Sequence, residues 1–177
     1  MNKDIKTLIL KEIEDSKTFI GDFIGFSVKN KFYLYNKKSG LFYSYKYKIN
    51  DAIRVQTKDF LSFAHIIDED VFPFCKKCTC LIEDNQLKDL EYLKPLLSLR
   101  GGKNGCSYIG LTFYKEGYKV TFNAQTIVGV LKFGLDDMLN TFGSGSEYVI
   151  DHINNEKTYN AWNNIQILTR RDNRWGK

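Results

Sequence analysis

The side chains best suited to chemistry lie in the C-terminal segment 147–177. Asp151 and His152 stand side by side after a short apolar stretch, and Asn164 and Asn173 follow them. Carboxylate and amide oxygens are hard ligands of the kind that Mg²⁺ prefers, and an imidazole can accept a proton near neutral pH. These residue types suit a metal-assisted hydrolysis in which a side chain activates water.

Basic residues surround the last of these four. Four residues have the i, i+3, i+4 and i+7 spacing that places side chains on one helical face: Arg170, Asn173, Arg174 and Lys177. Arg171 lies beside them. Such a face would bind phosphates. A plainer interpretation is a solvated helix end whose cations interact favourably with the helix dipole.

Phosphodiester hydrolysis needs all of these groups together. In this interpretation Asp151 and Asn173 bind Mg²⁺ or Mn²⁺, and the basic side chains hold the phosphates of the substrate. His152 deprotonates the attacking water. Two protein ligands leave coordination positions for water and phosphate oxygens, as is usual for Mg²⁺.

Two strands and a helix must position these groups. Residues 148–150 are typical of a strand that ends at Asp151 and His152, residues 165–169 are typical of a second strand, and a basic helix begins near Arg170. A unit this small buries little apolar surface, so local hydrogen bonds must hold its loop. Asn164 can bind backbone groups of that loop through its amide.

This segment resembles the HNH endonuclease motif, in the Asp-His, Asn, Asn form that is frequent in phage and intron-associated nucleases. The residues that match the family's spacing are Asp151, His152, Asn154, Asn160, Asn164, Thr169 and Asn173. The resemblance implies a ββα-metal fold with His152 as general base and Asn164 as the brace of the loop. It also implies that Asp151 and Asn173 are the metal ligands.

The function that this resemblance implies is sequence-specific cleavage of DNA. Restriction-type cutting of both strands by a homodimer and phage- or homing-type nicking both stay open. A DNA-binding protein that keeps the shape of the unit without cleaving is the alternative from another class. An Asp-His pair alone ends many strands before a turn, so the full set of matched residues carries the resemblance.

The rest of the chain is expected to form an α+β fold, because 43% of the residues are hydrophobic and 15% aromatic, with many Tyr and Phe in short alternating runs. We expect a β-rich recognition or dimerisation region at 1–100, then a hairpin, a helix and the nuclease unit at 101–177. The expected elements are a helix at 4–13, three strands within 19–47, helices at 57–67 and 86–94, two strands within 106–122, a helix at 124–139 weakened by Gly129 and Gly134, and a Gly/Ser hinge at 143–146.

Cysteines offer a second metal site. Cys75 and Cys78 have the spacing of half a zinc knuckle, and Cys80 and Cys106 could complete a tetrahedral Zn²⁺ site. Packed or incidental thiols are the alternative. His65, between apolar neighbours, is expected to be a core residue.

Charge and hydropathy limit the partners. A net charge of +5 favours a polyanionic partner without identifying one. No apolar run approaches the length of a bilayer span, and charged residues occupy the start of the chain, so we expect no membrane partner. The expected compartment is the cytoplasm of a bacterial or phage-infected cell.

Overall fold

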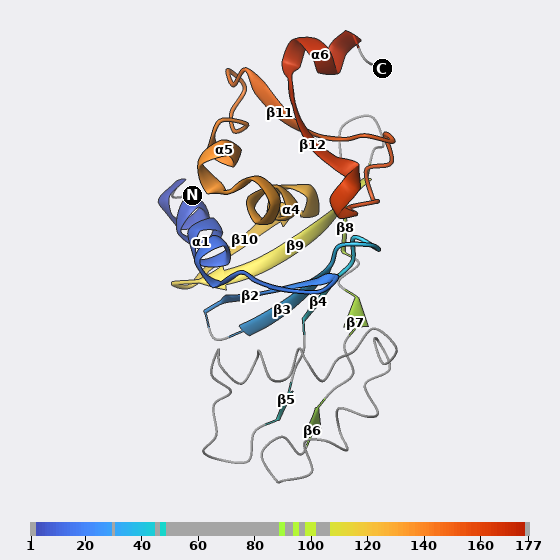
Figure 1. Cartoon of the computed structure of the whole chain (residues 1–177). Helices are drawn as coiled ribbons and strands as arrows, with labels where there is room; N and C mark the ends of the chain where they lie inside the picture. Colours follow the sequence, from blue (N-terminus) through green and yellow to red (C-terminus); the bar gives the residue numbers. More distant parts are fainter. Residues whose placement is uncertain are drawn as a thin grey trace.

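The computed structural model describes residues 3–29, 31–44, 47–48, 89–90, 94–95, 98–101 and 107–175. Within these ranges the chain is a mixed α+β protein built from four small antiparallel sheets and a few helices (Figure 1). The α+β class expected from the sequence is confirmed.

Helix α1 (Lys3–Ser16) opens the structure and packs on β2 and α4. Its apolar face is buried through Ile5, Ile9, Leu10 and Ile13, which repeat at helical spacing. The helix expected at 4–13 is therefore confirmed, with one further turn.

The first sheet has the strand order β1-β2-β3-β4-β7. Its strands are β1 (Thr18–Ile20), β2 (Phe23–Val28), β3 (Lys31–Asn36), β4 (Phe42–Ser44) and β7 (Lys94–Pro95). The expectation of three strands within 19–47 was too low, because the region supplies four strands here and also β5 (Tyr47–Lys48). The tight turn at Gly21, with φ +55°, splits one apolar run into two strands.

The helix expected at 86–94 is wrong where that region is described. Asp89–Leu90 forms β6, which pairs with β5, and Lys94–Pro95 pairs with β4. Partners distant in the sequence decide strand formation, so local helix propensity was a poor guide. The helix expected at 57–67 lies outside the described residues.

The second half begins with a three-stranded sheet, β8 (Ser98–Gly101), β9 (Ser107–Lys115) and β10 (Tyr118–Asn123). The hairpin expected about residues 115–117 is confirmed. Helices α4 (Ala124–Phe133) and α5 (Leu135–Leu139) follow. The helical conformation is interrupted between them at Gly134, whose φ is +90°.

Gly129 lies inside α4 and does not interrupt it. A Cβ at this position would lie 2.3 Å from Met138 Sδ and 2.5 Å from Ile150 Cδ1. Close packing against α5 and the C-terminal hairpin therefore explains a glycine that weakened the helical pattern in the sequence.

Helix α4 lies at the centre of the described part of the chain. It contacts β9 and β10 on one side and the C-terminal strands β11 and β12 on the other (Figure 1). One hydrophobic cluster includes Ile9 of α1, Phe26 of β2, Ile127 of α4 and Ile165 of β12. The N-terminal and C-terminal regions expected from the sequence therefore share a core. Among the described residues, no helix has the length and apolar character needed to cross a membrane.

Candidate functional site at the C-terminal hairpin

The C-terminal unit is a hairpin followed by a helix. Strands β11 (Tyr148–His152) and β12 (Ile165–Thr169) are antiparallel, and α6 (Arg170–Trp175) begins directly after β12. A short 3₁₀ turn, η2 (Trp162–Asn164), precedes β12. The expected order of strand, loop, strand and helix is confirmed, and β11 delivers two buried polar residues, Asp151 and His152, at its end.

A buried amide fixes the ring of His152. The distance between His152 Nε2 and Asn160 Oδ1 is 2.9 Å. Asn160 Nδ2 donates to the main-chain oxygen of Thr158, so the network assigns Oδ1 as the acceptor from the ring. Nε2 then carries the proton of the neutral imidazole, and Nδ1 is its basic nitrogen.

Asn164 holds the loop between the two strands. Its Oδ1 accepts from the main-chain nitrogen of Asn154 at 3.0 Å. Its Nδ2 donates to the main-chain oxygen of Tyr159 at 2.7 Å and to Asn154 Oδ1 at 2.8 Å. These bonds confirm the expected contact of Asn164 with loop backbone groups.

Asp151 is oriented by a residue that the sequence did not single out. Gln166 Nε2 donates to Asp151 Oδ2 at 3.2 Å, and the two residues are paired across β11 and β12. The signal that could have found Gln166 is the register of the hairpin, which places Gln166 directly opposite Asp151.

Asn173 lies on α6, which packs against both strands of the hairpin. Its Oδ1 is buried and has no hydrogen-bond partner. The helix starts with a reciprocal cap, because Thr169 Oγ1 accepts from the main-chain nitrogen of Asp172 and donates to its carboxylate at 2.7 Å. A buried oxygen without a donor costs stability, and a bound water molecule or cation would offset that cost.

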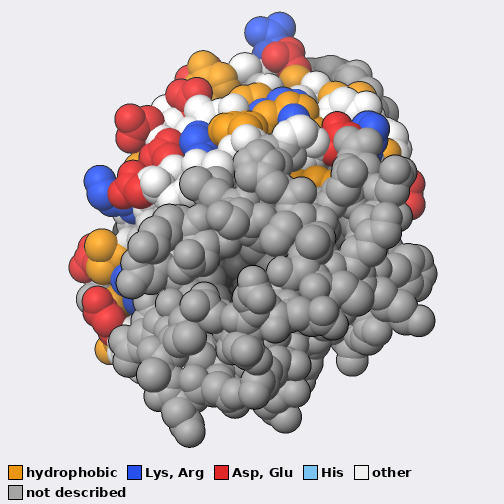
Figure 2. Space-filling model, turned by 60° about the horizontal axis from the view of Figure 1, so that its bottom comes forward, with side chains coloured by type: hydrophobic (Ala, Val, Ile, Leu, Met, Phe, Trp, Pro, Cys, Tyr) orange, Lys and Arg blue, Asp and Glu red, His pale blue; other side chains and the backbone are white. Residues whose placement is uncertain are grey.

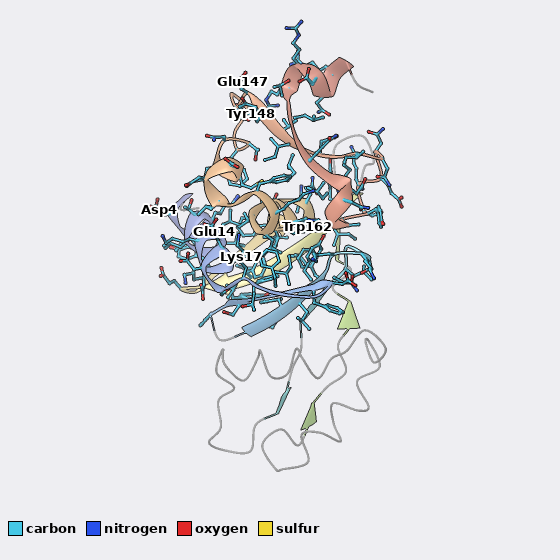
Figure 3. The ribbon with its side chains drawn as sticks, viewed as in Figure 1. Asp4, Glu14, Lys17, Glu147, Tyr148 and Trp162 are labelled. Atoms are coloured by element: carbon cyan, nitrogen blue, oxygen red, sulfur yellow. The ribbon has the colours of Figure 1, made fainter. Side chains whose placement is uncertain are left out.

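The basic residues of α6 do not share one environment. Arg170 donates through Nε to the main-chain oxygen of Ser146 and through an Nη to that of Gly143. Arg170 therefore ties α6 to the turn at 143–146, near the labelled Glu147 and Tyr148 (Figure 3). Arg171 and Arg174 are exposed, and Lys177 lies outside the described residues.

The first sheet supports the loop from inside the molecule. Tyr35 Oη donates to the main-chain oxygen of Asn160 at 2.7 Å, and the main-chain nitrogen of Trp162 donates to the oxygen of Lys37 at 2.9 Å. Neither contact could be predicted from the sequence, because the partners lie more than a hundred positions apart.

Lys132 of α4 supports the same loop. Its Nζ donates to the main-chain oxygens of Trp162 and Ile165 at 2.6 and 2.9 Å and lies 5.7 Å from the centroid of the Trp162 ring. Desolvation lowers the pKa of Lys132 from its usual value. The lysine thus fixes the entry to β12.

Within the described ranges, no three His, Cys, Asp or Glu side chains form a group that could hold a metal ion. Of the two expected metal ligands, only Asp151 is one of these four residue types. The other, Asn173, would contribute an amide oxygen. The residues of the expected zinc site, and the histidine expected in the core, lie outside the described residues: Cys75, Cys78, Cys80, Cys106 and His65.

Surface charge does not mark a binding face by itself. Figure 2 shows Lys and Arg side chains mixed with Asp and Glu along the described edge of one face.

No protein-family model matches the chain, and neither does any curated protein or solved structure.

Proposed function

We propose that this chain is a metal-dependent DNA endonuclease of the HNH type. The observation that carries the proposal is the bond between His152 and Asn160. A buried amide oxygen that accepts from Nε2 leaves Nδ1 as the nitrogen that takes a proton, which is the state that a general base requires. The resemblance of segment 147–177 to the HNH motif supports the same role for His152.

The donors expected to bind a metal fit Mg²⁺ or Mn²⁺. Asn173 offers a buried amide oxygen without a partner, and Asp151 offers a carboxylate of which one oxygen is oriented by Gln166. Both are hard oxygen ligands. A bound divalent cation would supply Lewis-acid stabilisation of negative charge on the phosphate and the leaving oxygen.

Other residues would position the catalytic loop or bind the DNA. Asn164 keeps the loop beside His152 in one conformation through its three side-chain bonds. Arg171 and Arg174 are exposed on α6, where they would bind phosphates of double-stranded DNA without reading bases. Sequence recognition then falls to residues outside the hairpin unit.

Incubation of supercoiled plasmid with the purified chain tests the proposal. We expect cleavage in Mg²⁺ or Mn²⁺, none in EDTA, and none with His152→Ala. Binding to DNA without cleavage in either metal would contradict the proposal and favour a DNA-binding protein. Discrete fragments would indicate restriction-type cutting, whereas open circles would indicate nicking.

Two further measurements address the expected partners. The oligomeric state in solution would show whether the chain forms a homodimer able to cut both strands. Metal analysis of the purified chain would test whether the cysteines bind Zn²⁺.

A further inference from the structure

A chain of hydrogen bonds connects the first sheet to the histidine of the candidate site. Tyr35 is fully buried in β3, and its hydroxyl donates to the main-chain oxygen of Asn160 at 2.7 Å. The side chain of Asn160, only 1% exposed, binds His152 Nε2 at 2.9 Å. One residue therefore joins the N-terminal sheet to the imidazole ring.

The Tyr35 hydroxyl is held in its donor state. Burial, and to a smaller extent the neighbouring Tyr159, raises the pKa of Tyr35 above its usual value. The hydroxyl keeps its proton at neutral pH and can only satisfy the carbonyl of Asn160 by donating to it. If this hydroxyl were removed, a buried carbonyl would lose its partner.

The turn after β3 closes on the same part of the loop. Gly40, with φ +72°, lies so close to the loop that a Cβ would be 2.3 Å from the main chain of both Asn160 and Ala161. The main-chain nitrogen of Trp162 donates to the oxygen of Lys37. The packing of Gly40 and the hydrogen bond from Tyr35 together set the position of the Asn160 backbone, and therefore the position of its Cβ.

We propose that Tyr35 is a positioning residue for His152 and acts through Asn160. Its hydroxyl fixes the Asn160 main chain, the Asn160 side chain accepts from Nε2, and the ring is held in one orientation and one neutral tautomer. The effect on catalysis rests on the proposed function, whereas the effect on the ring does not. The N-terminal sheet thereby becomes part of the site.

Nitrogen spectra of the histidine rings test the link directly. The chain has two histidines, so His152→Gln assigns their signals. At one mildly alkaline pH, where imidazole is neutral, we expect the wild-type chain to show His152 protonated on Nε2. Tyr35→Phe and Asn160→Ala should each give a mixture of the two neutral tautomers.

Two variants separate positioning from general disruption. Asn160→Asp keeps an acceptor oxygen and should retain the Nε2-protonated form. Tyr33→Phe removes the hydroxyl of another buried tyrosine of β3 and should leave the His152 signals unchanged. If Tyr35→Phe matches Tyr33→Phe in its ring signals, the proposal is overturned, whether or not the chain cleaves DNA.

Cleavage kinetics give the second measurement. Tyr35→Phe should lower kcat by about tenfold to a hundredfold and leave KM within about twofold, because a misplaced base slows the reaction more than it weakens ground-state binding. An unchanged kcat in a variant whose tautomer changes would refute the catalytic part. A wild-type chain that does not cleave, with the tautomers changing as expected, would refute the nuclease proposal alone.

Discussion

Tyr35 and Asn160 are 125 positions apart in the sequence, yet the hydroxyl of the first donates to the main-chain oxygen of the second over 2.7 Å. The contact fixes the loop between β11 and β12 against the first sheet. Lys132 of α4 fixes the end of the same loop through two main-chain oxygens. The geometry of the candidate site therefore depends on elements far from segment 147–177.

Replacing His152 by Ala should abolish DNA cleavage and leave DNA affinity within a few-fold of wild type. A general base contributes about 10²–10⁴ in rate and little to ground-state binding. Single-turnover cleavage and equilibrium binding, measured on one substrate, separate the two effects. Turnover at the wild-type rate would remove His152 from the reaction.

Asp151→Ala and Asn173→Ala should each raise the Mg²⁺ concentration needed for cleavage by about tenfold or more, with partial rescue by excess Mn²⁺. Asn173→Ala should cost no more than about 0.5 kcal/mol of folding stability, because its Oδ1 has no partner to lose. Metal titrations of activity and urea unfolding measure the two quantities. A titration curve that matches wild type would exclude either residue as a metal ligand.

Asn164→Ala should lower the free energy of unfolding by about 2–4 kcal/mol. Its side chain makes three hydrogen bonds at the loop, and each such bond contributes about 0.5–1.5 kcal/mol. The neighbouring Asn163 is exposed, so Asn163→Ala is a matched control that should change stability by less than about 0.5 kcal/mol. Equal losses in the two variants would contradict the bracing role.

Arg174→Ala should weaken binding similarly for every DNA sequence and reduce the salt slope of log affinity by about one, because one phosphate contact is lost. Binding isotherms at several salt concentrations measure this slope. A change in target sequence with an unchanged slope would mean that Arg174 reads bases.

Arg170→Ala should instead loosen α6 from the turn at 143–146 and lower the melting temperature, since Arg170 donates to main-chain oxygens of Gly143 and Ser146.

Alkaline pH should destabilise the wild-type fold through its buried tyrosines. Burial raises the pKa of Tyr33 to about 12 and raises that of Tyr35 as well. Above pH 10 the unfolded chain releases these protons while the folded chain keeps them, so stability falls by up to about 1.4 kcal/mol per pH unit for each group. Tyr33→Phe should therefore flatten the fall in unfolding free energy between pH 10 and about 12. Parallel curves for wild type and variant would contradict this expectation.

The sequence predicted the local elements of the site well. The apolar residues before Asp151, the alternation at 165–169 and the basic stretch after Thr169 each act within a few positions, so short-range pattern was enough to place strand, loop, strand and helix. The hydrogen bonds of Asn164 were also predictable, because its partners lie within its own loop.

The sequence by itself thus determined which side chains of the C-terminal unit could carry chemistry, and the structure decided what holds them. Register between β11 and β12 made Gln166 the partner of Asp151, and the docking of β3 brought Tyr35 to Asn160. Pairing with β5 and β4 likewise made strands β6 and β7 of a region that was expected to be helical. These relationships depend on contacts between segments distant in the chain, whose energies outweigh local propensity and leave no periodic trace in the sequence.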